Sequence, residues 1–137
     1  MNLVEVSGGN KFQRDIAAKV IYKMIETLLP RVRTLDICVK IKKFADDAVG
    51  YCMMADNHTE FEIEISKDLT LREFVTTLCH EMVHAKQYYR KEMDGEIHRW
   101  KKHMVPEGTD YFDLPWEKEA YRKQDYLAQL CWDADIL

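Results

Sequence analysis

The segment His80-Glu81-Met82-Val83-His84 places two imidazoles and a carboxylate close together, in the pattern H-E-x-x-H. Because positions i and i+4 lie on one face of a helix, His80 and His84 can hold a single metal ion. Glu81 lies beside them, where its carboxylate can take a proton from a water molecule next to that ion. The segment therefore predicts a metal centre suited to hydrolysis.

A third ligand is needed, because a catalytic zinc ion typically has three protein ligands and one open position. Helical phase favours Glu117, whose stripe is small and partly apolar and which would face inward. That stripe contains Ala120, Tyr121, Gln124, Ala128 and Cys131. Glu119 shares its stripe with charged and polar residues, and we expect it to face water. Glu119, His98 and His103 stay open as alternatives to Glu117.

The elements before the motif are those of an α+β domain. Asn10 and Gln13 have the spacing of a capping box, and the apolar pattern from Phe12 to Leu28 predicts a helix that Pro30 ends. Alternating apolar residues predict three strands, at 35–42, 49–54 and 60–66. Short connections favour antiparallel pairing for at least some of them, and the acidic outer face of the third suits a sheet edge.

The helix that carries the motif is predicted to have two different sides. Thr70 and Glu73 form its capping box, and an apolar stripe from Leu71 to Ala85 should pack on the sheet. The stripe with the two histidines and Glu81 should face a cleft. Between 91 and 113 the pattern is irregular, with room for one short helix across 96–103. Pro115 should begin a final helix that extends to about Trp132.

This order of elements resembles the gluzincin metallopeptidases in their smallest form, the minigluzincins. The segment from Leu114 to Tyr121 is similar to the third-ligand helix of small SprT-like peptidases. The resemblance implies a zincin-like minimal domain, with an N-terminal helix, a small three-stranded and mostly antiparallel sheet, an active-site helix and a C-terminal helix with the third ligand. Tyr121 departs from the family pattern, which commonly has Asp or Asn there to orient a zinc-bound histidine.

The resemblance also implies a function, the hydrolysis of peptide bonds in a peptide or protein substrate. Zn²⁺ would be bound by His80, His84 and Glu117, with Glu81 as general base. The strand at 61–65 would bind an extended substrate by edge pairing. Five residues are candidates to stabilise the oxyanion: Tyr88, His98, His103, Tyr111 and Tyr121. We hypothesise that the loop at 91–113 borders the cleft and inhibits the enzyme.

Composition sets the wider limits. With 137 residues, 47% of them hydrophobic, we expect one ordered domain over 1–137. The net charge of −4 gives no general case for nucleic-acid binding, and the basic residues Arg99, Lys101 and Lys102 should be solvated. No signal peptide or membrane-spanning segment is apparent, and four scattered cysteines suggest free thiols. We therefore expect a cytoplasmic protein without a membrane partner; the oligomeric state is not indicated.

Two other functions compete with the peptidase. One is a non-catalytic zinc-binding module with a regulatory or interaction role, in which the metal holds two helices together. Glu81 argues against it, because a structural site needs no such carboxylate. The other is a DNA-associated SprT-like protease, but the sequence has no zinc ribbon or extended basic segment of the kind those proteins carry.

Overall fold

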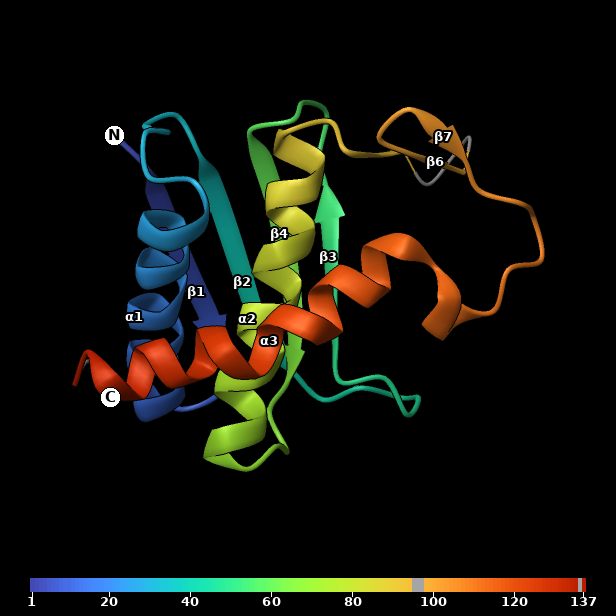
Figure 1. The fold of residues 1–137 in the computed structure, drawn as a ribbon. Coiled ribbons are helices and arrows are strands. Elements are labelled where there is room, and N and C mark those ends of the chain that lie inside the picture. The colour runs from blue at the N-terminus through green and yellow to red at the C-terminus, as the bar shows by residue number, and fades with distance from the viewer. Residues whose placement is uncertain (95–97, 136) are drawn as a thin grey trace.

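The structure is a computed structural model that describes residues 1–94, 98–135 and 137 (Figure 1). Within these residues the fold is α+β, as predicted, with three α-helices, a four-stranded mixed sheet and a small antiparallel sheet. The elements, in chain order, are β1 (Leu3–Gly8), α1 (Lys11–Leu28), β2 (Asp36–Lys42), β3 (Gly50–Met54), β4 (Glu60–Ser66), α2 (Leu71–Tyr89), β5 (Met93–Asp94), β6 (Arg99–Trp100), β7 (His103–Met104), the 3₁₀ turn η1 (Tyr111–Asp113) and α3 (Pro115–Asp133).

Both predicted capping boxes are present. The side chain of Asn10 accepts a hydrogen bond from the backbone of Gln13 at the start of α1, and Thr70 does the same for Glu73 at the start of α2. Each partner's side chain returns to the N-cap backbone, so two free N–H groups are satisfied at each helix start. The local sequence therefore fixes where both helices begin.

The prediction of a sheet of three mostly antiparallel strands was wrong. The order is β1-β2-β4-β3, with β1 parallel to β2, β2 parallel to β4, and only β3 antiparallel to its neighbour. The first strand was missed, and α1 is the crossover that makes it parallel to β2. The chain then passes over one strand position to form β3, and β4 returns into the gap. Connection length alone could not reveal that return.

The predicted edge position of β4 was wrong for the same reason. Its acidic outer face lies beside the basic outer face of β2, where Lys40 meets Glu62 at 2.8 Å and Lys42 meets Glu64 at 3.2 Å. These charges form cross-strand pairs within the sheet. The free edges of the four-stranded sheet belong to β1 and β3.

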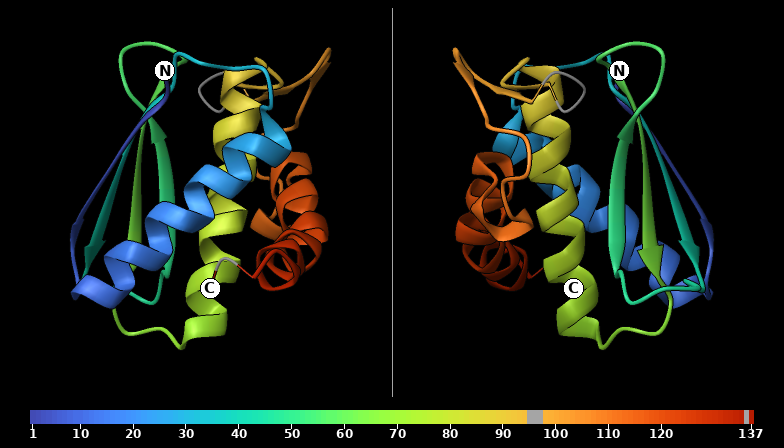
Figure 2. Two further views of the ribbon diagram at one scale, coloured as in Figure 1. Left: turned by 90° about the vertical axis from the view of Figure 1, so that its left-hand side faces the viewer. Right: turned by 90° about the vertical axis from the view of Figure 1, so that its right-hand side faces the viewer.

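The helices form two further layers on one face of the sheet. Figure 2 shows α1 and α2 against that face and α3 beyond α2. The core between the sheet and α2 contains fully buried Ile37, Ile63, Leu78 and Met82. Two residues of the predicted apolar stripes, Phe12 and Leu71, are exposed instead. They line a shallow hollow between the first turns of α1 and α2.

The segment after α2 forms the small sheet β5-β6-β7. A helix predicted across 96–103 is wrong for residues 98–103, and its first two residues lie outside the described part of the chain. His98 and Lys101 have left-handed backbone conformations, with φ of 50° and 56°, which a helix does not accommodate. Met93, Val105 and Trp116 form a small second core beneath these strands.

The cysteines were expected to be buried free thiols; all four are free, and two are fully buried. These two are Cys79 and Cys131, whereas Cys38 and Cys52 are half-buried. The basic residues Arg99, Lys101 and Lys102 are exposed, as predicted. Among the described residues, no helix has the length and apolar character needed to cross a membrane.

Candidate metal centre

The two histidines of the motif lie in the middle of α2, on the side that faces α3. The opposite side of the helix is held in the core by Leu78 and Met82, so the histidine side is directed away from the sheet. His80 and His84 are 6% and 7% exposed, and their ring centroids are 5.0 Å apart. The predicted pair is therefore buried and convergent.

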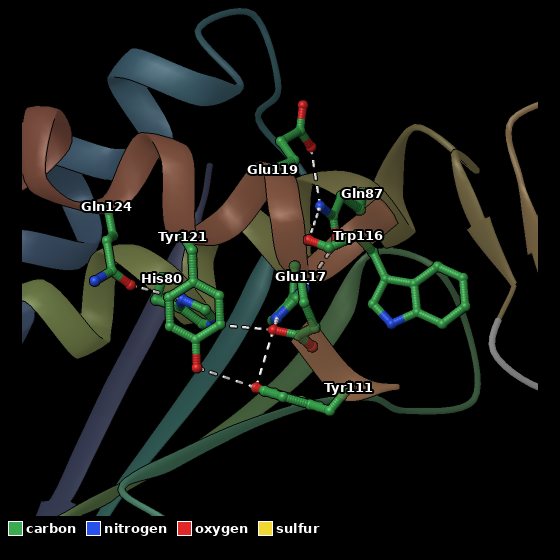
Figure 3. A network of polar contacts seen from close by, with 9 residues as sticks. His80, Gln87, Tyr111, Trp116, Glu117, Glu119, Tyr121 and Gln124 are labelled. Carbon is green, nitrogen blue, oxygen red and sulfur yellow. Dashed lines mark hydrogen bonds and ion pairs between the residues drawn. The ribbon is translucent and has the colours of Figure 1, made fainter. Parts of the chain in front are cut away.

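Glu117, the preferred third ligand, is brought to the pair by the first turn of α3. Its Oε1 atom lies 3.0 Å from His80 Nε2 and 3.2 Å from His84 Nε2 (Figure 3). The three ligand atoms all lie within 4.8 Å of one another. Across the described part of the chain, this is the one group of three or more His, Cys, Asp or Glu side chains that could hold a metal ion.

The electrostatics of the cluster suit a cation. Burial alone would raise the pKa of Glu117, but hydrogen bonds and charge from His80 and His84 outweigh it and lower the pKa to about 2. Burial disfavours the charged form of His84, yet the hydrogen bond and charge of Glu117 raise its pKa above the usual value. An ionised carboxylate thus faces two imidazoles, and a divalent metal ion could replace the protons between them.

Both histidines are oriented by glutamines that the sequence analysis did not identify as partners. Gln124 Oε1 lies 2.8 Å from His80 Nδ1, and Gln87 Oε1 lies 2.8 Å from His84 Nδ1. Their spacing was a usable signal, because Gln124 is two helical turns after Glu117 and Gln87 is one turn after His84. These amides orient the histidines where the resemblance implied an Asp or Asn at position 121. The ring of Tyr121 instead packs edge-on against His80, with ring centroids 4.5 Å apart.

Glu119 was expected to face water, and that was wrong. It is 6% exposed and lies between Lys86, at 3.1 Å, and Lys123, at 2.9 Å. Lys86 also pairs with Glu92 at 2.7 Å, so charges of opposite sign alternate along this network. Glu119 looked solvent-facing because its stripe is charged, but Lys123 on that stripe and Lys86 on α2 are its partners. It joins α3 to α2 and is not within the candidate ligand cluster.

His98 and His103, the two histidines considered as third ligand, also lie away from the cluster. His98 packs edge-on against Trp116, with ring centroids 6.2 Å apart, and His103 is exposed on β7. Neither is among the residues that line the cleft over the histidine pair. Of the oxyanion candidates, the three tyrosines line this cleft: Tyr88, Tyr111 and Tyr121.

The cleft is an open cavity of about 790 Å³ bounded by α2, α3, η1 and β3. The hydroxyl of Tyr111 donates to Glu117 Oε1 at 3.0 Å and lies 3.5 Å from the hydroxyl of Tyr121. Met93 and Tyr111 bring the segment 91–113 to the cleft, as predicted. The strand at 61–65, within β4, was predicted to border the cleft and bind substrate at its edge, but β4 is paired on both sides. The strand that borders the cleft is β3.

Glu81 lies in the wall of the cleft, 6% exposed and outside the three-residue cluster. Burial raises the pKa of its carboxyl, and the nearby histidines offset part of that rise. Gly50 at the start of β3 leaves room for it. A Cβ atom at position 50 would lie 3.1 Å from Glu81 Oε2 and 2.8 Å from Thr77 Cγ2.

No protein-family model, curated protein or solved structure matches the chain. The function must therefore be inferred from the geometry of the site.

Proposed function

We propose that this protein is a zinc-dependent peptidase of the gluzincin type. The observation that carries the proposal is the position of Glu81, a buried carboxylate in the wall of an open cleft, beside a three-residue cluster suited to a metal. A site that only binds metal has no need of a second carboxylate held apart from the ligands.

Zinc is the proposed metal because the donors are two imidazoles and one carboxylate, a set typical of catalytic zinc sites. His80, His84 and Glu117 would hold it, and the two glutamines support neutral imidazoles whose Nε2 atoms face the metal. A zinc ion held there would lower the pKa of a water molecule and polarise a substrate carbonyl.

The chain's own residues supply the remaining steps. Glu81 would accept a proton from the attacking water and pass it to the leaving amine. Its raised pKa suits both roles, because a base and acid works best when its pKa is closer to the working pH. Tyr111 and Tyr121 present hydroxyl groups at the same cleft and are the proposed donors to the developing oxyanion.

The proposed substrate is a peptide in extended conformation. β3 pairs with β4 on one side only, and its residues 50–52 line the cleft. An extended peptide could pair with its other side by strand addition, which would place a peptide bond between Glu81 and the cluster.

The test combines metal content with cleavage of a peptide library, using wild type, Glu81→Gln and the exposed control Glu107→Gln. We expect near-stoichiometric zinc in all three and cleavage in wild type and the control only. Loss of the general base should reduce kcat by about 10²–10⁴-fold. Zinc without cleavage in any form would favour the non-catalytic binding module. Absence of zinc after zinc is supplied would contradict the proposal.

A further inference from the structure

His84 is contacted at both ring nitrogens by groups that depend on α3. Its Nε2 atom faces Glu117 Oε1 at 3.2 Å, and its Nδ1 atom faces Gln87 Oε1 at 2.8 Å. Gln87 belongs to α2, but its amide nitrogen reaches α3, where it donates to the Trp116 carbonyl at 3.0 Å and to Glu119 Oε1 at 2.9 Å.

These contacts fix which way the Gln87 amide points. A carbonyl and a carboxylate only accept hydrogen bonds, so the NH₂ group must face Trp116 and Glu119. The amide oxygen must then face His84, where it accepts the Nδ1 proton. Gln87 is fully buried, so water does not compete for either end of the amide. The Nε2 lone pair of a neutral His84 is thereby directed at the candidate metal position.

Glu119 is itself held firmly. Lys86 contacts both of its carboxylate oxygens at 3.1 Å, and Lys123 contacts Oε2 at 2.9 Å. Two lysines contact this carboxylate inside the protein, and a carboxylate accepts a stronger hydrogen bond from the Gln87 amide than a neutral group does. The orientation of His84 thus traces back to a charge that lies outside the ligand cluster.

His80 is held differently. Its Nδ1 partner, Gln124, is half-buried, and among the described residues the Nδ1 contact is the one hydrogen bond of that amide. The two histidines of the motif therefore differ in how far they are fixed before a metal binds. The polar contacts of Figure 3 show this asymmetry around Gln87 and Gln124.

We propose that Glu119 and Gln87 form a positioning relay that sets the ring of His84 for a metal ion. The relay rests on the proposed zinc site and adds a determinant of its affinity, a residue that touches neither metal nor substrate. Outer partners of metal-bound histidines typically change metal affinity by about 10–100-fold, because a free imidazole must otherwise be ordered and set in the correct tautomer on binding.

The test is a double-mutant cycle on zinc affinity, measured by competition with a chromogenic chelator at one pH. Gln87→Met should raise the Kd for zinc about 10–100-fold, whereas the exposed control Gln129→Met on α3 should leave it unchanged. Glu119→Gln should raise it less, about 3–10-fold, because the new amide still accepts from Gln87 without the charge. In the Gln87→Met background, Glu119→Gln should change the Kd by less than about twofold.

The non-additivity separates a relay from two structural effects. Equal effects of Glu119→Gln in both backgrounds, or a folded Gln87→Met variant with wild-type affinity, would overturn the relay. If Gln87→Met does not fold, the relay is tested on the wild-type protein by NMR spectroscopy. With ¹⁵N-labelled histidine and bound zinc, the Nδ1 proton of His84 should be visible and exchange more slowly than that of His80. Its absence would also overturn the relay, and failure of wild type to bind zinc would instead contradict the proposed function.

Discussion

Both sides of α2 are buried, but they are held by different interactions. Toward the sheet, Val75, Leu78 and Met82 are fully buried among apolar neighbours. Toward α3, His84 and Gln87 are also buried, at 7% and 0% exposed, and both make directed hydrogen bonds to polar side chains. Apolar burial has no preferred direction, whereas each polar contact requires one geometry.

The comparison separates stability from chemistry. The sheet side determines where the helix lies and tolerates changes of similar shape. The α3 side determines where two imidazoles and two carboxylates point. Removing one partner there leaves the other partner buried without its hydrogen bond or counter-charge. Substitutions on the sheet side should therefore reduce fold stability and leave the metal site intact, whereas those on the α3 side should also reduce metal affinity or turnover.

The largest effect is expected on the α3 side, at Glu117. Glu117→Ala removes one of three proposed ligands, so zinc affinity should fall by more than the roughly 100-fold that the loss of an outer partner can cause. Chelator competition measures it, with Glu107→Ala as the exposed control. Affinity within tenfold of wild type would show that Glu117 does not bind the metal.

On the sheet side, Met82→Ala should destabilise the fold by about 2–5 kcal/mol, because it leaves a cavity in the core. Denaturant unfolding of the metal-free protein measures this, and Met54→Ala, at an exposed position, should have little effect. Zinc affinity of the folded variant should be unchanged. A loss of affinity like that of Glu117→Ala would mean that the two sides are not separable.

Gly50 tests how closely the cleft is fitted around Glu81. Gly50→Ala would bring a Cβ to 3.1 Å from Glu81 Oε2, so the carboxylate must shift. We expect kcat to fall about 10–100-fold with zinc affinity retained, because small misplacements of a reacting group are costly. Steady-state kinetics and metal content, measured on the same preparation, test whether kcat falls while zinc is retained. An unchanged kcat would place the working position of Glu81 elsewhere.

Glu119 should make the free energy of unfolding depend on pH in the acid range. Burial opposes its charge, but hydrogen bonds from Gln87, Lys123 and Lys86 lower its pKa from 4.5 to about 2. A lowered folded-state pKa contributes stability above the unfolded pKa, and that contribution is lost as pH falls from 4.5 toward 2. Denaturant unfolding of metal-free protein should lose on the order of 2 kcal/mol over this range. Glu119→Gln should flatten the dependence; an equal slope would assign it to other groups.

The smallest effect is expected at Tyr111. Tyr111→Phe removes the hydroxyl that reaches Glu117 Oε1 and the cleft. We expect kcat to fall about tenfold, less than the roughly 10²–10³-fold cost of losing an oxyanion donor, because the Tyr121 hydroxyl lies at the same cleft. The exposed control is Tyr126→Phe. A rise in kcat would instead support the hypothesis that the segment 91–113 inhibits the enzyme.

Much of the fold's local structure could be predicted from the sequence. The capping residues Asn10 and Thr70 act on their own helices, so their effects are visible in a short window. The arrangement of the sheet could not be predicted, because β4 pairs directly with β2 although β3 lies between them in the sequence. Leu3–Gly8 was missed, since its strand partner β2 comes after a whole helix.

The site divides in the same way. The H-E-x-x-H spacing selected His80, Glu81 and His84, and helical phase selected Glu117. Gln87 lies one helical turn after His84, but its bonds to Glu119 and Trp116 on another helix could not be predicted from that spacing. Glu119 was misplaced for a related reason, since charged neighbours on one stripe do not reveal whether a second helix covers them.

Crystallography of zinc-soaked protein, with anomalous data on both sides of the zinc edge, tests the central claim most directly. We predict one strong anomalous peak bonded to His80 Nε2, His84 Nε2 and Glu117 Oε1, with the Glu81 carboxylate beside the open position and not bonded to the ion. A peak ligated by Glu119, His98 or His103, or a fully occupied site in which Glu81 is a ligand, would contradict it.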